Sequence, residues 1–177
     1  MPAIHDGEAV LANAGFLAAV ADELGLPTIG TAQNPGRLGP NLPPVAEHLD
    51  VVVDKMAFGA WEGGLLEALG DLDPGQERRD VVIAGCEAHV CLLQTALGLL
   101  ETGRRVWVVA DASGSRHGSD RAAAMERLRD AGATVVTGRP PARKRPTSSI
   151  GRTVADNPMR WAGRGRSASR RSSDTAR

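Results

Sequence analysis

The chain is poor in aromatic residues, with three Trp, two Phe and no Tyr among its 177 residues. A folded core must therefore be built from Ala, Val and Leu. The length suits one domain with enough apolar residues to form such a core. No apolar run approaches the roughly 20 residues that span a bilayer, and the N-terminus lacks a basic segment followed by an apolar one. We therefore expect no membrane partner.

The sequence also lacks the residue patterns of several other classes of protein. Its two cysteines, five residues apart, do not make a disulfide framework, which fits a reducing cytoplasm as the predicted compartment. His5, His48 and His117 show no metal-ligand spacing, so we predict neither a metal nor another cofactor. No G-x-G-x-x-G opens the first βα unit, which disfavours a dinucleotide-binding fold.

The net charge of zero conceals an uneven distribution. Residues 138–177 hold eleven Lys or Arg and two acidic residues, whereas residues 1–137 hold ten basic and nineteen acidic residues. The basic segment is rich in Arg, Ser, Gly and Pro and has no sustained periodicity, so we predict a disordered tail at 138–177 after a folded domain at 1–137. Its arginines make nucleic-acid contact through the tail an alternative function, although Trp161 alone offers a base-stacking surface.

Short apolar runs alternate with segments of helical periodicity along residues 1–137. The pattern predicts helices over 7–25, 65–69, 90–102 and 119–131, the last capped by Ser119, and strands over 27–31, 49–53, 81–84, 105–110 and 133–137. Such alternation indicates an α/β fold, in which helices cover both faces of a parallel sheet.

The most informative stretch is DVVIAGCEAHVCLLQTALGLL, residues 80–100. An apolar β-branched run stops at Gly85, and a helical pattern resumes near Val90, as in a parallel βα unit. Cys91 therefore falls in the first turn of the helix, beside the unpaired backbone N–H groups and the positive end of the helix dipole. A thiol in that position is biased toward the thiolate, which attacks carbonyl carbon.

Three separated motifs resemble one protein family. The run GCEAHVCLLQTALGLLETGRRVWVVADASGSRHGSD, together with TAQNPGRLGP and DKMAFGAW, is similar to the isochorismatase-like cysteine hydrolases, which include nicotinamidases. The resemblance covers about residues 2–137. It implies a three-layer αβα sandwich with a six-stranded parallel sheet, and hydrolysis of a small amide or related C–N substrate by an Asp–Lys–Cys triad.

The resemblance carries functional roles onto particular residues. Cys91 matches the nucleophile and Lys55 the triad lysine. Lys55 also follows a predicted strand, at the sheet edge where open α/β folds bind ligands. Cys86 and Glu87 match the position of a non-proline cis peptide, which would help to aim the N–H groups of Val90 and Cys91 as an oxyanion hole. The alternatives are a packing role for Cys91 and a solvated strand end for Lys55.

Other residues near these motifs have two interpretations each. Gln33 and Asn34 either line the substrate pocket or form a turn, and Trp61 either forms a pocket wall or packs in the core. Cys86 is expected to pack rather than react. His89, two residues before Cys91, is expected to face a neighbour or water rather than act as its base.

The chain also departs from the family pattern. The resemblance places an initial strand, with the triad aspartate, before the segment MPAIHDG, so we expect the first central strand to be missing and its neighbours to be left unpaired on one side. Loss of the aspartate predicts attack by Cys91 with poor turnover, because general acid catalysis typically supplies about 10²- to 10⁴-fold. A non-catalytic member of the fold, which binds a small molecule or forms part of an oligomer, is the alternative, and a homo-oligomer is expected in either case.

Overall fold

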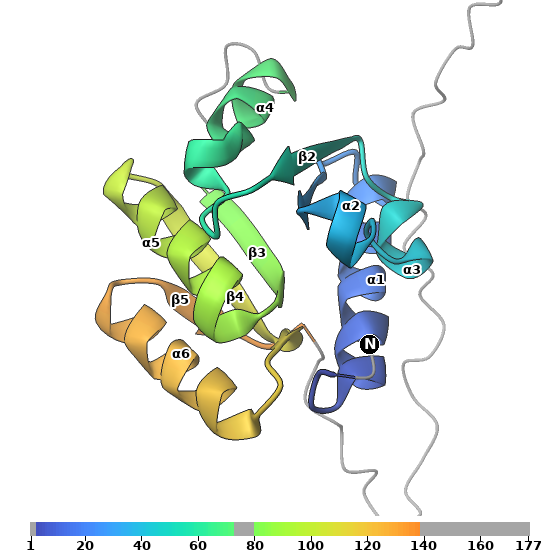
Figure 1. Ribbon diagram of the computed structural model, residues 1–177. Helices are drawn as coiled ribbons and strands as arrows, with labels where there is room; N and C mark the ends of the chain where they lie inside the picture. Colours follow the sequence, from blue (N-terminus) through green and yellow to red (C-terminus); the bar gives the residue numbers. More distant parts are fainter. Residues whose placement is uncertain (1–2, 73–79, 139–177) are drawn as a thin grey trace, which may run out of the picture. The chain divides into compact units, whose positions relative to one another are not determined.

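Parallel strands form two sheets in the part of the chain that the computed structural model describes, residues 3–72 and 80–138 (Figure 1). Strand β1 (Ile29–Gln33) pairs with β2 (Val51–Lys55), in a register that places Gln33 opposite Lys55. The second sheet has the order β3 (Asp80–Cys86), β4 (Arg105–Gly114) and β5 (Thr134–Val136).

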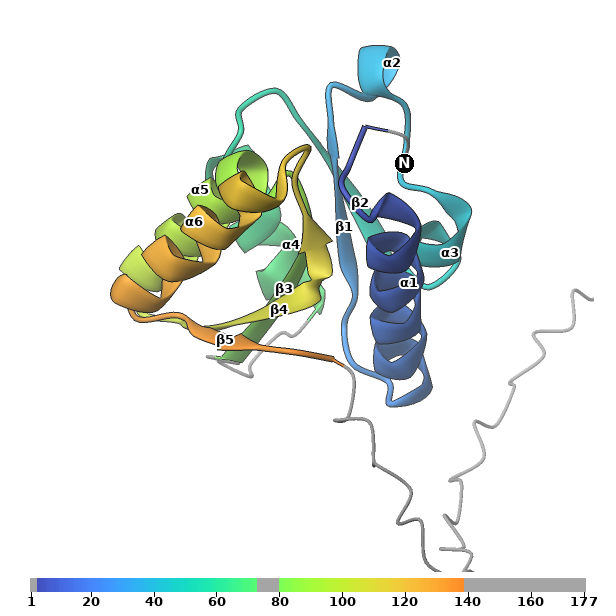
Figure 2. The same cartoon turned by 90° about the horizontal axis from the view of Figure 1, so that it is seen from below.

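Helix α1 (Gly7–Glu23) precedes the first strand, and the other helices connect the strands, as in a series of parallel βα units. These are α2 (Pro35–Leu38), α3 (Pro43–Ala46), α4 (Leu65–Leu72), α5 (Leu93–Glu101) and α6 (Gly118–Asp130), with a 3₁₀ turn at Trp61–Gly63 and a π-helical turn at Ala88–Leu92. Helices α5 and α6 lie side by side against the three-stranded sheet, and α1 lies on its other side (Figure 2). The α/β class with parallel strands is confirmed.

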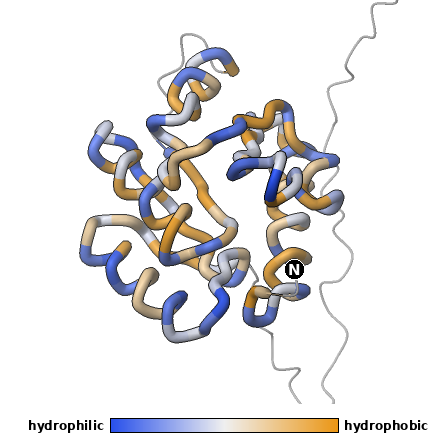
Figure 3. The backbone as a smooth tube through the Cα atoms, viewed as in Figure 1, coloured by the Kyte–Doolittle hydropathy of each residue, from blue (hydrophilic) through white to orange (hydrophobic). Residues whose placement is uncertain are grey.

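The core is built from small and aliphatic side chains, as expected for a chain with few aromatic residues. Leu99 of α5, Val106 and Val108 of β4, and Leu128 of α6 are almost completely buried. Figure 3 shows the apolar colouring along β3 and the mixture of polar and apolar residues along α6, whose buried face meets this core. No helix in the described residues is long and apolar enough to cross a membrane.

The structure differs from the sequence-based expectation in several places. Strand β4 continues to Gly114, four residues beyond the predicted end, and the loop after β1 contains the one-turn helices α2 and α3. Ser119 does not cap α6: the helix begins at Gly118 after an extended His117, with no side-chain cap.

The strands form two sheets rather than the six-stranded sheet that the resemblance implies. Among the described residues, β1 and β3 each pair with a strand on one side only. The predicted tail at 138–177 lies outside the described residues except for Gly138, whose N–H donates to Asp111 Oδ1 at 2.8 Å.

Candidate active site

The turn between β3 and α5 places Cys91 at the start of a helix. The peptide bond between Cys86 and Glu87 is cis, at the position where the resemblance places one. The chain then forms the π-helical turn Ala88–Leu92, in which the Leu92 N–H donates to the Glu87 carbonyl at 3.2 Å. Cys91 is the fourth residue of this turn and is partly buried. Single π-helical turns are rare and occur frequently at functional sites.

One buried hydroxyl connects Cys91 with a distant loop. Thr95, on α5, donates from Oγ1 to the Cys91 carbonyl at 2.7 Å. The same Oγ1 accepts the backbone N–H of Ala60 at 3.0 Å. Both Thr95 and Ala60 are buried. The turn that carries Cys91 is thus joined to the loop that follows β2.

That loop holds the Lys55 side chain. Lys55 is the last residue of β2 and only 4% exposed. Its Nζ donates to the carbonyls of Ala57 and Phe58, at 3.1 and 2.9 Å, and to Gln33 Oε1 at 2.6 Å. In the described part of the chain no carboxylate pairs with this ammonium group, so the positive charge is buried among neutral oxygens. Three hydrogen bonds to the ammonium group offset part of the cost of burying it.

Gln33 and Asn34 both bond to the end of β2. The Gln33 amide accepts from Lys55 and donates from Nε2 to the Met56 carbonyl at 2.7 Å. The Asn34 N–H donates to the Lys55 carbonyl at 2.9 Å, and Asn34 has a left-handed backbone before α2. Gln33 therefore orients the candidate catalytic lysine, and Asn34 turns the chain out of the sheet.

Trp61 lies against α5. A Cβ atom built on Gly98 would come within 2.1 Å of Trp61 Cδ1, so the indole fills the space that the glycine leaves on the helix surface. The structure thus brings Trp61 to the helix that follows Cys91, in contact with Gly98. This contact with Gly98 is a packing contact.

His89 contacts the loop between β4 and α6. Its Nδ1 lies 2.9 Å from Oγ of the buried Ser115 and 3.9 Å from Glu87 Oε2. Glu87 in turn pairs with Arg116, whose Nε lies 3.1 Å from Glu87 Oε1. These contacts tie the turn before Cys91 to the end of β4, and they give His89 a neighbour other than the Cys91 thiol.

The second cysteine has apolar surroundings. A Cβ atom on Gly114 would meet side-chain atoms of Ile4, Val10 and Cys86, which shows that Cys86 Sγ packs beside these two aliphatic residues. Burial raises the pKa of the Cys86 thiol, and a hydrogen bond with the Gly114 backbone only partly opposes this shift. A thiol of this kind is a poor nucleophile at neutral pH.

The two N–H groups expected to form an oxyanion hole are not equivalent. The Val90 N–H donates to the Glu87 carbonyl at 3.2 Å inside the π-helical turn. A substrate oxygen at this position would have to share or displace that bond. The Cys91 N–H lies one residue further along the same turn.

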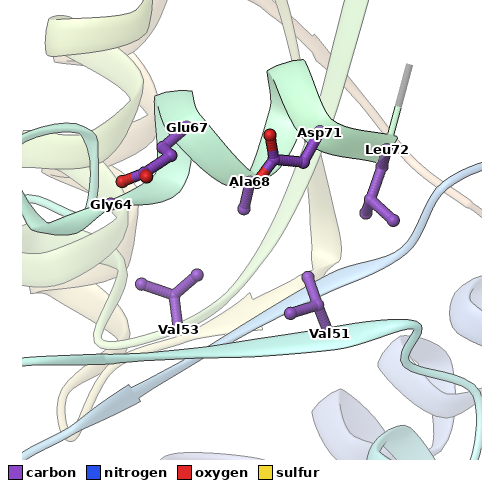
Figure 4. Close-up of a pocket in the computed structure, with 7 residues that line it drawn as sticks. All are labelled: Val51, Val53, Gly64, Glu67, Ala68, Asp71 and Leu72. Carbon is purple, nitrogen blue, oxygen red and sulfur yellow. The ribbon is translucent and has the colours of Figure 1, made fainter. Parts of the chain in front are cut away.

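A cavity of about 260 Å³ lies apart from these residues, between β2 and α4 (Figure 4). Its floor is apolar, with Val51 and Val53 facing Ala68 and Leu72, and the carboxylates of Glu67 and Asp71 lie along its α4 side. None of the residues that line it is one of the predicted site residues. The described residues contain no group of three or more His, Cys, Asp or Glu side chains that could hold a metal ion.

Thr95 is the site residue that the sequence reasoning missed. It lies four residues after Cys91, one helical turn further along the same face, so the spacing alone offered a signal. Its bond to Ala60 joins positions 35 residues apart and could not be inferred from local pattern.

A fold in which helices connect parallel strands places the chain in the α/β class. The isochorismatase domain model matches residues 1–139, and the chain belongs to this family.

Relatives with known sequences agree. The chain is 37% identical over 128 residues to isochorismatase domain-containing protein 2 of Bos taurus, covering 72% of this chain and 61% of the relative. It is 33% identical over 133 residues to the secreted isochorismatase effector Isc1 of Phytophthora sojae, covering 72% of this chain and 62% of that protein. The chain thus spans about three fifths of the length of these curated relatives.

Solved structures show the same fold. The MAR1 ribonuclease of Caenorhabditis elegans superposes with a TM-score of 0.69 at 34% identity, covering 76% of this chain and 69% of the other. YcaC of Pseudomonas aeruginosa, solved with covalent acrylamide, gives 0.67 at 29% identity, with coverage of 74% and 65%. YcaC of Escherichia coli, described as an octameric hydrolase of unknown specificity, gives 0.66 at 28% identity, with coverage of 73% and 64%.

Proposed function

We propose that this protein is a cysteine hydrolase of a small amide or related C–N substrate, with Cys91 as nucleophile and Lys55 as the cation of the site. The observation that carries this function is the hydrogen-bonded series from Lys55 through the Ala57–Ala60 loop to Thr95 and Cys91. It ties a buried cation to the turn that holds the thiol. Membership of the isochorismatase family supports the hydrolase class.

In the proposed reaction the Cys91 thiolate attacks the carbonyl carbon of the amide, and a C–S bond forms. Collapse of the tetrahedral intermediate breaks the C–N bond, and the amine leaves with one proton taken from a water molecule. Water then attacks the thioester, which breaks the C–S bond, releases the acid and restores the thiolate. Backbone N–H groups of the π-helical turn would stabilise the oxyanion.

Attack by Cys91 is expected to be followed by slow release of the amine, so that turnover is poor. The leaving amine needs a proton, and all three N–H groups of Lys55 already donate to neutral oxygens. Since no carboxylate among the described residues pairs with Lys55, that ammonium group has no neighbouring acid from which to relay a proton. We therefore expect loss of general acid catalysis, which typically contributes about 10²- to 10⁴-fold.

Thiol labelling tests the nucleophile directly. The full chain is treated with iodoacetamide at neutral pH, and the adducts at Cys91 and Cys86 are measured by peptide mass spectrometry. Faster labelling of Cys91, slowed by excess nicotinamide and reduced in Lys55→Met, is the expected result. Cys91→Ser controls for adducts elsewhere. Equal labelling of both thiols, without competition by the amide, would rule out Cys91 as the nucleophile.

Release of ammonia from a panel of small amides separates catalysis from binding. Slow release by the wild type and none by Cys91→Ser is expected of a hydrolase. Protection of Cys91 by the amide without any release of ammonia would instead favour the non-catalytic, small-molecule-binding alternative.

We also propose that the protein forms homo-oligomers. The E. coli YcaC neighbour is described as octameric, and both Phe16 of α1 and Leu24, the residue that follows this helix, are exposed. Light scattering after size exclusion should give a mass above that of one chain, and Phe16→Ser with Leu24→Ser should lower it. A monomeric wild type would refute self-association.

A further inference from the structure

Thr95 has a hydroxyl group that serves two separate segments. It donates to the Cys91 carbonyl at 2.7 Å and accepts the Ala60 N–H at 3.0 Å. A threonine in a helix often donates to the carbonyl four residues back, so the first bond alone would be unremarkable in a helix. The second bond comes from a different element, and the atoms that it joins lie in residues that are 5% and 1% exposed.

The segment on the other side of this bond holds the lysine. Ala57 and Phe58 supply two of the three acceptors for Lys55 Nζ, and Ala60 follows two residues after Phe58. Movement of Ala60 would therefore move the carbonyls that aim the ammonium group. Trp61, the next residue, is fixed against Gly98 of the same helix, so the loop is held to α5 at two adjacent points.

We propose that Thr95 is the positioning residue that sets the Cys91 turn against the Lys55 loop. The effect on catalysis rests on the proposed function. The link between the two segments does not, because it consists of the two hydrogen bonds of the Thr95 hydroxyl. Thr95 does not touch the substrate. Its hydroxyl fixes the Cys91 carbonyl and, through Ala60, the loop whose carbonyls accept from Lys55. Removal of the hydroxyl should therefore let the Cys91 turn and the Lys55 loop move relative to each other.

The test uses two substitutions in the full chain. Thr95→Val keeps the branched shape and removes the hydroxyl, and Thr95→Ser keeps the hydroxyl and removes the methyl group. In Thr95→Val, exchange of the Ala60 amide hydrogen should speed up, and iodoacetamide labelling of Cys91 should slow about threefold to tenfold, as expected for the loss of one or two neutral hydrogen bonds. Labelling of Cys86 should stay unchanged. Thr95→Ser should restore both properties.

The outcomes are separable. An unchanged exchange rate of the Ala60 amide hydrogen in Thr95→Val would show that Thr95 does not join the two segments, whatever the activity. Faster labelling of both Cys86 and Cys91 in Thr95→Val would also contradict the proposal, because it would mean that the substitution loosens the core and does not act on the position of Cys91. Faster exchange at Ala60 with an unaltered rate at Cys91 would overturn the positioning role. If Cys91 is unreactive in the wild type, the proposed function fails, and the Ala60 exchange still decides whether Thr95 joins the two segments.

Discussion

The side chains of Gln33 and Lys55, opposite each other on β1 and β2, bind each other, with 2.6 Å between Oε1 and Nζ. Replacement of Gln33 by Met removes an acceptor from a buried ammonium group. We expect Gln33→Met to lower the free energy of unfolding by about 1–3 kcal/mol, the usual cost of an unsatisfied buried donor. Urea unfolding at neutral pH measures this loss.

A matched control for this substitution lies on α5. Gln94 is exposed, and Gln94→Met should change the free energy of unfolding by less than about 0.5 kcal/mol. If both variants lose the same stability, the Gln33 amide is not a specific partner of Lys55. Slower labelling of Cys91 in Gln33→Met alone would further connect this amide to the site.

The second prediction concerns the contact between Trp61 and α5. A methyl group at Gly98 would overlap the indole, whose Cδ1 and Nε1 lie 2.1 and 2.3 Å from the added Cβ. Gly98→Ala should therefore destabilise the fold by about 1–3 kcal/mol, as overpacking usually does. Urea unfolding and the tryptophan emission spectrum should both report the change.

Gly70 is the natural comparison, because it lies in helix α4 and an added Cβ there meets nothing within 4 Å. Gly70→Ala should stabilise the protein by about 0.5–1 kcal/mol through the ordinary helix preference for alanine. Loss of stability in Gly70→Ala equal to that in Gly98→Ala would mean that Trp61 is not the cause.

The order of the longer helices and strands could be predicted from the sequence because each one has a local pattern of apolar residues. The β-branched run from Val81 to Ile83 and the apolar spacing after Val90 were enough to place β3, α5 and Cys91 between them. The helix predicted over 119–131 was found as α6, but the predicted cap at Ser119 was wrong, since His117 precedes the helix and no side chain caps it.

The interactions that assemble the candidate site were not available from local pattern. Lys55 could be placed at a strand end, but its acceptors include Gln33, 22 residues earlier in the chain. The bond between Ala60 and Thr95 likewise depends on how α5 packs beside the loop after β2. Long-range partners of this kind follow from tertiary packing, which periodicity does not encode.

A third prediction follows from the buried thiol. Burial raises the pKa of Cys86 in the folded protein, so as the pH rises the unfolded chain releases this proton first. The stability contributed by Cys86 is complete below the ordinary thiol pKa, near about 8.5, and is lost as the pH rises through the raised value of the folded state. Between about pH 7 and about pH 10, the unfolding free energy should thus fall more steeply in the wild type than in Cys86→Ala. Parallel curves for the two proteins would contradict a raised pKa.

The fourth prediction has the opposite sign and concerns the start of the three-stranded sheet. Hydrogen bonds from Arg105, and next from Trp107, lower the pKa of the Asp80 carboxyl. A carboxyl with a lowered pKa contributes stability that is present above its ordinary value, about 3.9, and is lost as the pH falls through the lowered one. Asp80→Asn should therefore lower the unfolding free energy at neutral pH and reduce its loss in acid. Glu126→Gln, which removes an exposed carboxylate on α6, should leave the acid limb of the curve unchanged. Acid unfolding followed by circular dichroism measures both variants, and an identical acid response in Asp80→Asn and the wild type would show that Arg105 and Trp107 do not hold this carboxylate in its charged form.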